Sequence, residues 1–340
     1  MALLEVENLK TQFKTDAGIV RAVDGISFEV ERGETVGLVG ESGAGKTVAV
    51  RSILGLINDP GRIVDGSIKF DGTELTDLSE TELRQEVRGS KISMIFQDAM
   101  SALDPVHTVG EQIAEIVEHH QDVSSSQALE RTVELLDDVG IPDPEERANQ
   151  YPHEFSGGMQ QRAIIAMALS CDPQLIIADE PTTALDVTIQ SQIIELLRDI
   201  QDEYDTSMVY VTHDLGVVRE MCDRVQVMYL GEIVERASYE ELYYNPKHPY
   251  TQALFQSVVT ADRTVDELSS IEGTMSSAVN PPSGCRFHTR CPVSIEDCSA
   301  VSPKQYELAD GHEVACLLYD AAVEELEPSI GEVKGDEDPQ

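Results

Sequence analysis

Short runs of alternating hydrophobic and polar residues open the chain, over residues 3–40. Strands with one buried face produce this period of two, so the pattern predicts a strand-rich start. Gly18, Gly25 and Gly33 separate the runs, and we expect each of them to form a turn.

The pattern changes to helical spacing between residues 108 and 150. Apolar side chains recur there every three or four positions, which predicts two amphipathic helices. The serines at 124–126 can cap the second helix, and Gly140, Ile141 and Pro142 can end it. We therefore expect a helical insert between two halves of a larger α/β unit.

Helices and strands alternate after Ser156. The apolar runs at 175–178 and 208–211 predict buried strands, and residues 189–200 between them predict a helix. Strands that alternate with helices form a mainly parallel sheet with both faces covered. The pattern thus predicts an α/β fold.

A glycine-rich segment follows an apolar strand at 36–39 and opens a helix predicted at 47–56. Residues 40–47 read GESGAGKT and fit the P-loop pattern G-x-x-x-x-G-K-[ST]. In such a loop backbone N–H groups surround a phosphate, the lysine adds positive charge and the hydroxyl binds Mg²⁺. We expect Thr47 to be a Mg²⁺ ligand. The expected phosphate-binding residues are Gly40, Ser42, Gly43, Ala44, Gly45, Lys46 and Thr47.

Two carboxylates, Asp179 and Glu180, end the apolar strand at 175–178. A parallel strand delivers its carboxyl end to the edge of the sheet where ligands bind. We expect Asp179 to orient Mg²⁺ and Glu180 to polarise the water that attacks the γ-phosphate. Alone, the pair would equally suit a buried strand that ends in solvent, but the glycine-rich loop upstream favours the catalytic interpretation.

Residues 155–162 read FSGGMQQR and lie between the P-loop and the acidic strand. They resemble the signature motif of ABC ATPases, usually LSGGQ, with Phe and Met in place of Leu and Gln. The resemblance implies that Ser156, Gly157 and Gly158 form a second phosphate site at a helix N-terminus. Two chains would then close head to tail around two molecules of ATP.

Four more residues match motifs of the same family. The resemblance implies that Gln97 contacts Mg²⁺ or water and acts in catalysis together with Glu180 and His213, which hydrogen-bonds the γ-phosphate. Asp186 would belong to a loop that crosses between subunits, and Phe13 would stack on adenine.

The family resemblance also implies an architecture. It consists of a P-loop NTPase cassette with a RecA-like core, an antiparallel β subdomain and a helical subdomain at about residues 98–165. Residues 245–251, NPKHPYT, resemble the start of the C-terminal extension of dipeptide and oligopeptide importer ATPases. We therefore expect the cassette over 1–245 and the extension over 246–320. Residues 321–340 are acidic and predicted to be disordered.

Four of the six cysteines lie in this extension: Cys285, Cys291, Cys298 and Cys316. Their spacing lacks the C-x₂-C pairs of most zinc sites. Four thiolates suit an iron–sulfur cluster or zinc, and free thiols or disulfides are the third interpretation. In the importer ATPases that the extension resembles, these cysteines hold a [4Fe–4S] cluster, so the resemblance favours that cofactor beside ATP and Mg²⁺.

Acidic residues far outnumber basic ones, 63 to 24, for a formal net charge of −39. This charge repels the phosphates of nucleic acids, so we expect no nucleic-acid partner. The excess is spread from Glu5 to Asp338, which favours the protein of a halophile over an ordinary acidic protein with a charged tail.

No apolar run approaches the roughly 20 residues that a membrane span needs, and the N-terminus lacks the features of a signal peptide. The resemblance implies a peripheral protein on the cytoplasmic face of the cell membrane. Its implied partners are two transmembrane permease subunits, a second ABC ATPase in a heterodimer and, indirectly, an extracellular solute-binding protein. The expected cargo is a di- or oligopeptide or a related small solute.

Two other functions compete with import. A soluble ABC ATPase of translation or DNA repair usually joins two cassettes or carries a long coiled coil, and the sequence shows neither. A cassette that only binds ATP would be expected to lack catalytic residues, whereas Glu180 and His213 are in place. ATP hydrolysis coupled to import is the predicted activity.

Overall fold

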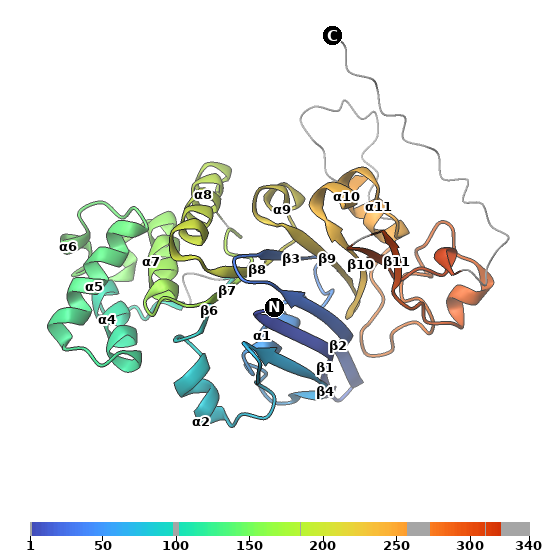
Figure 1. Ribbon diagram of the computed structural model, residues 1–340, viewed down its shortest axis with the longest axis horizontal. Helices are drawn as coiled ribbons and strands as arrows, with labels where there is room; N and C mark the ends of the chain where they lie inside the picture. The colour runs from blue at the N-terminus through green and yellow to red at the C-terminus, as the bar shows by residue number, and fades with distance from the viewer. Residues whose placement is uncertain (1, 98–101, 184, 257–272, 310, 321–340) are drawn as a thin grey trace, which may run out of the picture.

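The structure is a computed structural model that describes residues 2–97, 102–183, 185–256, 273–309 and 311–320. Figure 1 shows two β-sheets at the centre, a group of helices at one end and the last described residues at the other. The predicted tail at 321–340 lies outside the described residues, as does residue 98, where the helical subdomain is predicted to begin.

A mixed sheet forms the centre of the described chain, in the order β11-β12-β10-β9-β3-β8-β7-β6. Strands β9, β3, β8, β7 and β6 pair in parallel, whereas β10, β12 and β11 continue the sheet in antiparallel fashion. The predicted mainly parallel core is confirmed, and the carboxyl ends of β3, β7 and β8 meet at one edge. The strands are β3 (Thr35–Val39), β6 (Ile92–Ile95), β7 (Leu175–Asp179), β8 (Ser207–Thr212), β9 (Arg224–Tyr229), β10 (Glu232–Ser238), β11 (Tyr306–Ala309) and β12 (His312–Val314).

An antiparallel sheet, in the order β2-β1-β4-β5, contains the strands predicted near the start of the chain. The prediction of a turn at Gly25 is wrong, because β2 runs through it. Ile26 and Asp24 pair with the adjacent residues Leu9 and Lys10, so Gly25, at φ +94°, forms a bulge in the strand. The strands are β1 (Leu4–Thr15), β2 (Gly18–Val30), β4 (Gly61–Phe70) and β5 (Thr73–Glu74).

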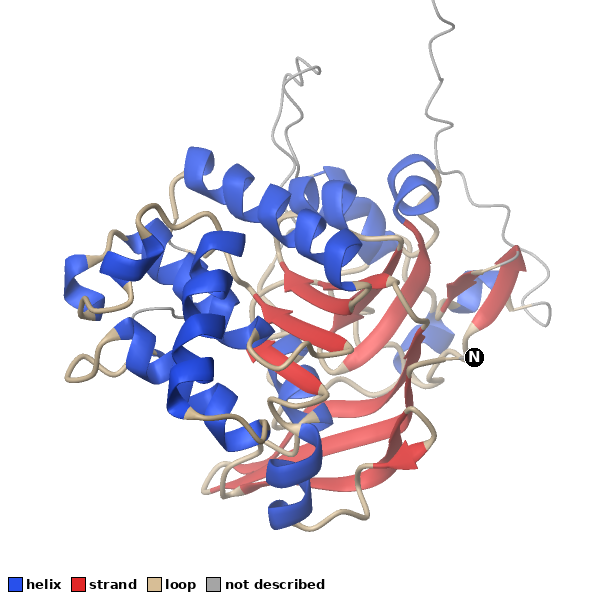
Figure 2. Cartoon of the chain, turned by 60° about the vertical axis from the view of Figure 1, so that its left-hand side comes forward, coloured by secondary structure: helices blue, strands red, loops and turns tan. Residues whose placement is uncertain are grey.

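The first helix, α1 (Lys46–Ile53), lies between the two sheets, where Leu38 of β3, Ile53 of α1 and Phe70 of β4 belong to one buried core. Burial of such side chains is the main favourable term in folding. The helix begins directly after the glycine-rich loop, so this core also anchors the loop. On the other side of the central sheet, Ile193 and Leu197 of the helix at Val187–Tyr204 belong to a second buried core with Ile176 and Tyr210 of the strands (Figure 2).

The predicted helical insert is present as α4 (Val109–His120) and α5 (Ser125–Asp138). Thr108 and Ser124 cap these helices through their hydroxyls, and Gly140, at φ +72°, follows the end of α5. Both helices pack against α7 (Gly157–Leu169) in the second core, which reaches the central sheet. The remaining helices are α2 (Glu80–Glu82), α6 (Pro144–Arg147), α7 (Gly157–Leu169), α8 (Val187–Tyr204), α9 (Leu215–Met221), α10 (Tyr239–Tyr244) and α11 (Pro249–Gln256), with shorter helical turns at Leu83–Val87, Pro152–Glu154, Glu296–Ser299 and Leu317–Tyr319.

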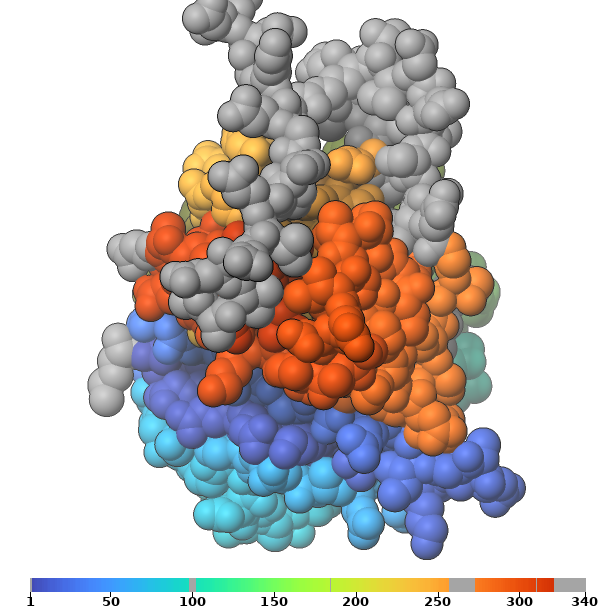
Figure 3. All heavy atoms as spheres, turned by 90° about the vertical axis from the view of Figure 1, so that its right-hand side faces the viewer, coloured from blue at the N-terminus to red at the C-terminus, as the bar shows by residue number. Residues whose placement is uncertain are grey.

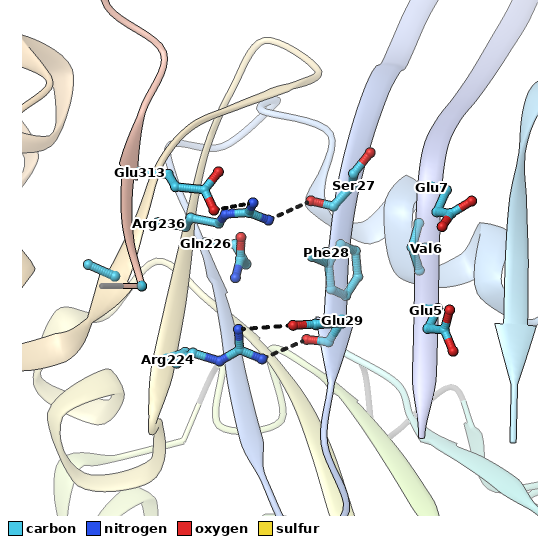
Figure 4. Close-up of a pocket in the computed structure, with 12 residues that line it drawn as sticks. Glu5, Val6, Glu7, Ser27, Phe28, Glu29, Arg224, Gln226, Arg236 and Glu313 are labelled. Carbon is cyan, nitrogen blue, oxygen red and sulfur yellow. Dashed lines mark hydrogen bonds and ion pairs between the residues drawn. The ribbon is translucent and has the colours of Figure 1, made fainter. Parts of the chain in front are cut away.

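Two arginines of the central sheet bond to the antiparallel sheet around a hollow of about 330 Å³. Arg236 donates to the Glu313 carboxylate at 2.5 Å and to the Ser27 carbonyl at 3.5 Å. Arg224 donates to the Glu29 carbonyl at 3.2 Å (Figure 4). Both guanidinium groups are therefore engaged in holding the sheets together.

The last described residues, 273–320, cover one face of the molecule (Figure 3). Their hairpin, β11 and β12, extends the central sheet because Val314 pairs with Glu235 of β10. Over the ranges that the structure describes, no helix has both the length and the apolar character needed to cross a bilayer.

Candidate functional site

The glycine-rich loop joins β3 to α1 and packs tightly against the backbone of two other strands. A Cβ on Gly40 would lie 2.2 Å from the Met228 carbonyl oxygen, and one on Gly45 would lie 2.1 Å from the Ala22 carbonyl oxygen. Both glycines also have positive φ, at +154° and +106°. Only glycine satisfies both the space and the torsion at these two positions.

The loop surrounds a buried lysine. Lys46 is 5% exposed, and its Nζ donates to the carbonyl oxygens of Gly40 at 2.8 Å and Glu41 at 3.2 Å. Burial lowers the pKa of Lys46, while Glu180 and Asp179 act to raise it. The loop tip, Ser42 and Gly43, is exposed, whereas Ala44 is buried. The seven predicted phosphate-binding residues therefore lie together in the loop and the first turn of α1, where Lys46 supplies the positive charge.

A buried carboxylate faces the start of α1. Asp179 is 0% exposed, and its Oδ1 accepts a hydrogen bond from Thr47 Oγ1 at 3.0 Å. Its Oδ2 has no hydrogen-bond partner among the described residues. Burial raises the pKa of Asp179. A carboxylate oxygen left without a donor, beside a hydroxyl, fits a hard divalent cation such as Mg²⁺, which binds oxygen ligands.

Three predicted catalytic side chains converge at the carboxyl edge of the central sheet. Gln97 follows β6, Glu180 follows β7 and His213 follows β8. Gln97 Nε2 donates to Glu180 Oε2 at 2.9 Å, and His213 Nδ1 lies 3.1 Å from Glu180 Oε1. The order of the parallel strands places these ends side by side.

Thr183 is a contact that the sequence reasoning missed. Its Oγ1 donates to Glu180 Oε2 at 3.0 Å. Glu180 itself has a left-handed backbone, with φ +49°, and its N–H donates to the carbonyl oxygen of Val211 on β8. These contacts hold Glu180 in an uncommon backbone conformation and so fix the direction of its carboxylate. Such conformations are often found at functional sites. A threonine three residues after the glutamate was the available signal.

The signature residues begin a different helix. Ser156 caps α7 by accepting from the Met159 N–H at 3.3 Å. A Cβ on Gly157 would meet nothing within 4 Å, and one on Gly158 would approach only Ile189 of α8. The N-terminus of α7 therefore presents small residues to open space, and its role as a second phosphate site stays a prediction.

Asp186 and Phe13 have structural contacts of their own. Asp186 caps α8, accepting from Thr188 at 3.1 Å and Ile189 at 3.0 Å. The Phe13 ring packs over Gly61 of β4, where an added Cβ would lie 2.4 Å from the ring. Crossing between subunits by Asp186 and adenine stacking by Phe13 stay predictions.

The four cysteines of the extension gather near one another. Cys298 and Cys316 are buried, and the Cys285 N–H donates to the Cys298 carbonyl at 2.9 Å. Burial is the main cause that raises the pKa of Cys285 to about 11 and that of Cys316 to about 12, and the other three cysteines contribute to the rise at Cys316. Thiols with raised pKa values are poor metal ligands until a cation favours the thiolate.

The four thiols are not arranged around a single ion. Within the described ranges, no three His, Cys, Asp or Glu side chains are grouped so that they could hold a metal ion. The structure therefore gives no support to zinc at these cysteines. Cysteine is the donor that an iron–sulfur cluster takes, but the same absence applies to it, so the [4Fe–4S] cluster stays a prediction.

Comparison with known proteins matches both parts of the chain. Residues 23–183 match the family described as ABC transporter, and residues 234–298 match the family described as Oligopeptide/dipeptide transporter, C-terminal region. The oligopeptide transport ATP-binding protein AppD of Bacillus subtilis is 47% identical over 319 residues, which cover 94% of this chain and 97% of that protein. The dipeptide transport ATP-binding protein DppD of Escherichia coli is 46% identical over 93% of this chain and 96% of its own length.

Solved structures with the same fold include a dimeric nucleotide-bound cassette. The ATP-binding cassette MJ0796, in a post-hydrolysis state bound to ADP and Pi, has a TM-score of 0.63 and 29% identity. The match covers 69% of this chain and 98% of that one. A second cassette, cbiO1 of Clostridium perfringens, has a TM-score of 0.61 and 28% identity over 72% of this chain and 91% of its own.

Proposed function

This chain belongs to the ATP-binding proteins of ABC transporters, an ATP-hydrolysing family, and we propose that it powers the import of di- or oligopeptides or related small solutes. The assignment to peptide import rests on the extension, because residues 234–298 match the C-terminal region of oligopeptide and dipeptide transporters. Relatives named for dipeptide and oligopeptide transport match over nearly the whole chain.

The convergence of Gln97 and His213 on Glu180 supports a hydrolytic site. In the proposed mechanism Glu180 accepts a proton from the attacking water. Gln97 and His213 orient the carboxylate and the water, and His213 donates to the γ-phosphate. Lys46 offsets the negative charge on the β- and γ-phosphates.

Thr47, Asp179 and Gln97 are the proposed Mg²⁺ ligands. When bound there, the cation would neutralise charge on the phosphate oxygens. The buried Oδ2 of Asp179, which has no donor among the described residues, supports this assignment. Backbone groups of the loop from Gly40 to Gly45 would hold the phosphates themselves.

A second ATPase completes the site in this proposal. Ser156, Gly157 and Gly158 at the exposed start of α7 would cap the nucleotide bound by the partner, with the helix dipole adding positive charge. Asp186 would lie at the contact between subunits, and Phe13 would meet the adenine. The proposed assembly is a heterodimer with another ABC ATPase.

The proposed place of action is the cytoplasmic face of the cell membrane. There the ATPase pair would bind two transmembrane permease subunits, which receive cargo from an extracellular solute-binding protein. We expect no nucleic-acid partner, because the net charge of −39 repels phosphates. The cassette is assigned to residues 1–245, with its helical subdomain at about 98–165, and the extension to residues 246–320.

Reconstitution tests the function. The chain, a second ATPase and two permeases are placed in proteoliposomes with the solute-binding protein outside, and uptake of a labelled tripeptide is followed with and without enclosed ATP. Uptake that requires both ATP and an intact Glu180 supports the importer. A chain that hydrolyses ATP but never copurifies with the permeases belongs instead to the soluble class of ABC ATPases.

We further propose that Cys285, Cys291, Cys298 and Cys316 hold a [4Fe–4S] cluster. The mutual proximity of the four thiols supports this assignment. Anaerobic purification followed by visible absorbance and by iron and sulfide analysis tests it. A colourless protein with one equivalent of zinc would show that the assignment is wrong.

A halophilic origin is a separate proposal, supported by acidic residues spread along the whole sequence. High salt screens the self-repulsion of such a chain. The melting temperature should therefore rise steeply between dilute buffer and molar KCl. Full stability in dilute buffer would contradict the proposal.

A further inference from the structure

Two side chains that follow the cassette converge on Glu41, the second residue of the P-loop. Arg290 Nη1 lies 3.0 and 3.2 Å from the two carboxylate oxygens of Glu41. The Tyr250 hydroxyl accepts the backbone N–H of Glu41 at 2.8 Å. Both the backbone and the side chain of this loop residue are therefore held from outside the cassette.

The groups that hold Glu41 are themselves fixed in an aromatic cluster. Tyr250 is 0% exposed, and its ring lies 4.7 Å from Tyr229 and 5.4 Å from Phe287 between centroids. The side chain of Arg290 is 5% exposed, and its guanidinium lies 5.9 Å from both the Tyr229 and Phe287 rings. Such packing removes the rotamer freedom that makes exposed ion pairs weak.

The held residue also contacts the lysine of the P-loop. The Glu41 carbonyl accepts from Lys46 Nζ at 3.2 Å, so the backbone that Tyr250 fixes helps to place the ammonium. The Glu41 carboxylate is close enough to act on the pKa of Lys46. Without Arg290, this carboxylate would repel incoming phosphates and compete with them for Lys46.

We propose that Arg290 and Tyr250 are positioning residues for ATP, which act through Glu41 to hold the P-loop and Lys46 ready for the phosphates. Arg290 neutralises a carboxylate at the edge of the phosphate site, and Tyr250 fixes the backbone beside it. The inference rests on the proposed binding of ATP at this loop. Under this inference the extension raises the affinity of the P-loop for ATP by way of Glu41.

Arg286 offers a matched control. It lies on the same turn and its side chain is 6% exposed, but it bonds to Asp24 and to the Leu230 carbonyl. Within the described residues it also pairs with Glu232, and these three contacts lie outside the P-loop. Replacing Arg286 thus loosens the attachment of the extension without touching Glu41.

The experiment measures KM for ATP, kcat and thermal stability in the assembled transporter at high KCl. Arg290→Gln should raise KM roughly tenfold, the effect of losing a charge-assisted hydrogen bond, with a smaller change in kcat. Arg290→Lys should restore part of the affinity. Tyr250→Phe, which removes one oxygen atom, should raise KM by a smaller factor.

The double variant Arg290→Gln with Glu41→Gln separates positioning from folding. Because the unpaired carboxylate is gone, its KM should return close to that of Glu41→Gln alone. Arg286→Gln should lower thermal stability while leaving KM near the wild-type value.

Two outcomes would overturn the inference. One is an equal rise in KM for Arg286→Gln and Arg290→Gln, and the other is a double variant whose losses simply add. Either would reduce Arg290 to an anchor of the extension. Failure of the wild-type chain to bind ATP would instead remove the proposed function on which the inference rests.

Discussion

The phosphate edge of the central sheet and the four-cysteine region of the extension build their sites in different ways. At the sheet edge, side chains from three parallel strands meet at Glu180 within 3.1 Å. In the extension, four thiols gather on loops and short turns without the grouping that a single metal ion needs. Hydrogen-bonded strands arrange their ligands in advance, whereas short irregular segments depend on the group they bind to set the final geometry.

The largest expected effect tests the pre-arranged side of this comparison. Glu180→Gln keeps the shape and the hydrogen bonds of the site but removes the base, so ATP turnover should fall at least about 100-fold. ATP binding should persist and the dimer should stay closed. Phosphate release and nucleotide binding are measured together, with Glu195→Gln on the exposed face of α8 as the control. Unchanged hydrolysis would show that Glu180 is not the base.

The cysteine region should respond in the opposite way. Cys316→Ser is expected to abolish the bound iron and its visible absorbance, because the remaining three thiols cannot complete the ligand set. Cys171→Ser, which changes a cysteine far from the extension, should keep both. Iron content and absorbance of the two variants decide the matter. Equal iron in both proteins would exclude Cys316 as a ligand.

The tight packing of the P-loop predicts a large effect on stability. Gly45→Ala places a Cβ 2.1 Å from the Ala22 carbonyl at positive φ, and it should cost about 2–4 kcal/mol of the free energy of unfolding. Gly157→Ala has open space around it and should leave the melting temperature unchanged. Denaturant unfolding gives the free energy of unfolding of the two variants, and thermal unfolding gives their melting temperatures. An unchanged free energy of unfolding for Gly45→Ala would mean that the loop can change its conformation to accommodate the added Cβ.

A smaller effect concerns His248, at the junction of the two regions. Complete burial lowers the pKa of His248 from 6.5 to about 4. Between these two pH values the imidazole is neutral in the folded protein and protonated in the unfolded chain. Stability from this residue is therefore present above pH 6.5 and is lost as the pH falls towards 4. Between pH 7 and pH 5 the loss should be about 2 kcal/mol.

The check on His248 uses a replacement that can still cap a helix. The His248 Nδ1 accepts the Tyr250 N–H at the start of α11, and asparagine can accept the same bond without titrating. The His248→Asn protein should lose this part of the pH dependence in unfolding experiments at pH 5 and pH 7. An unchanged slope would assign the dependence to other groups.

Much of the fold could be predicted from local patterns. The helices α4 and α5 and the caps Thr108 and Ser124 depend on residues three or four positions apart, so short windows of sequence contain the signal. Gly25 misled the prediction because a glycine at positive φ serves a turn and a bulge equally well. Whether Gly25 forms a turn or a bulge depends on how β2 pairs with β1, and a short segment of sequence does not contain that information.

The candidate site divides along the same line. The sequence predicted the phosphate loop from the spacing within residues 40–47. It also predicted the roles of Asp179, Glu180 and His213, since each belongs to a local motif. The contact of Thr183 with Glu180 was not predicted, although both lie in one short segment. It depends on the left-handed backbone of Glu180, which residue types alone do not predict.

The family, the phosphate loop and the acidic strand end could be predicted from the amino-acid order, because they depend on residue types at fixed short spacings. The folded chain was needed to show that Gln97 and His213 meet at one carboxylate and that Arg290 pairs with Glu41, 249 residues away. Strand order and the packing of the extension bring these groups together. Contacts between distant residues follow from the three-dimensional arrangement of the elements, which no local pattern contains.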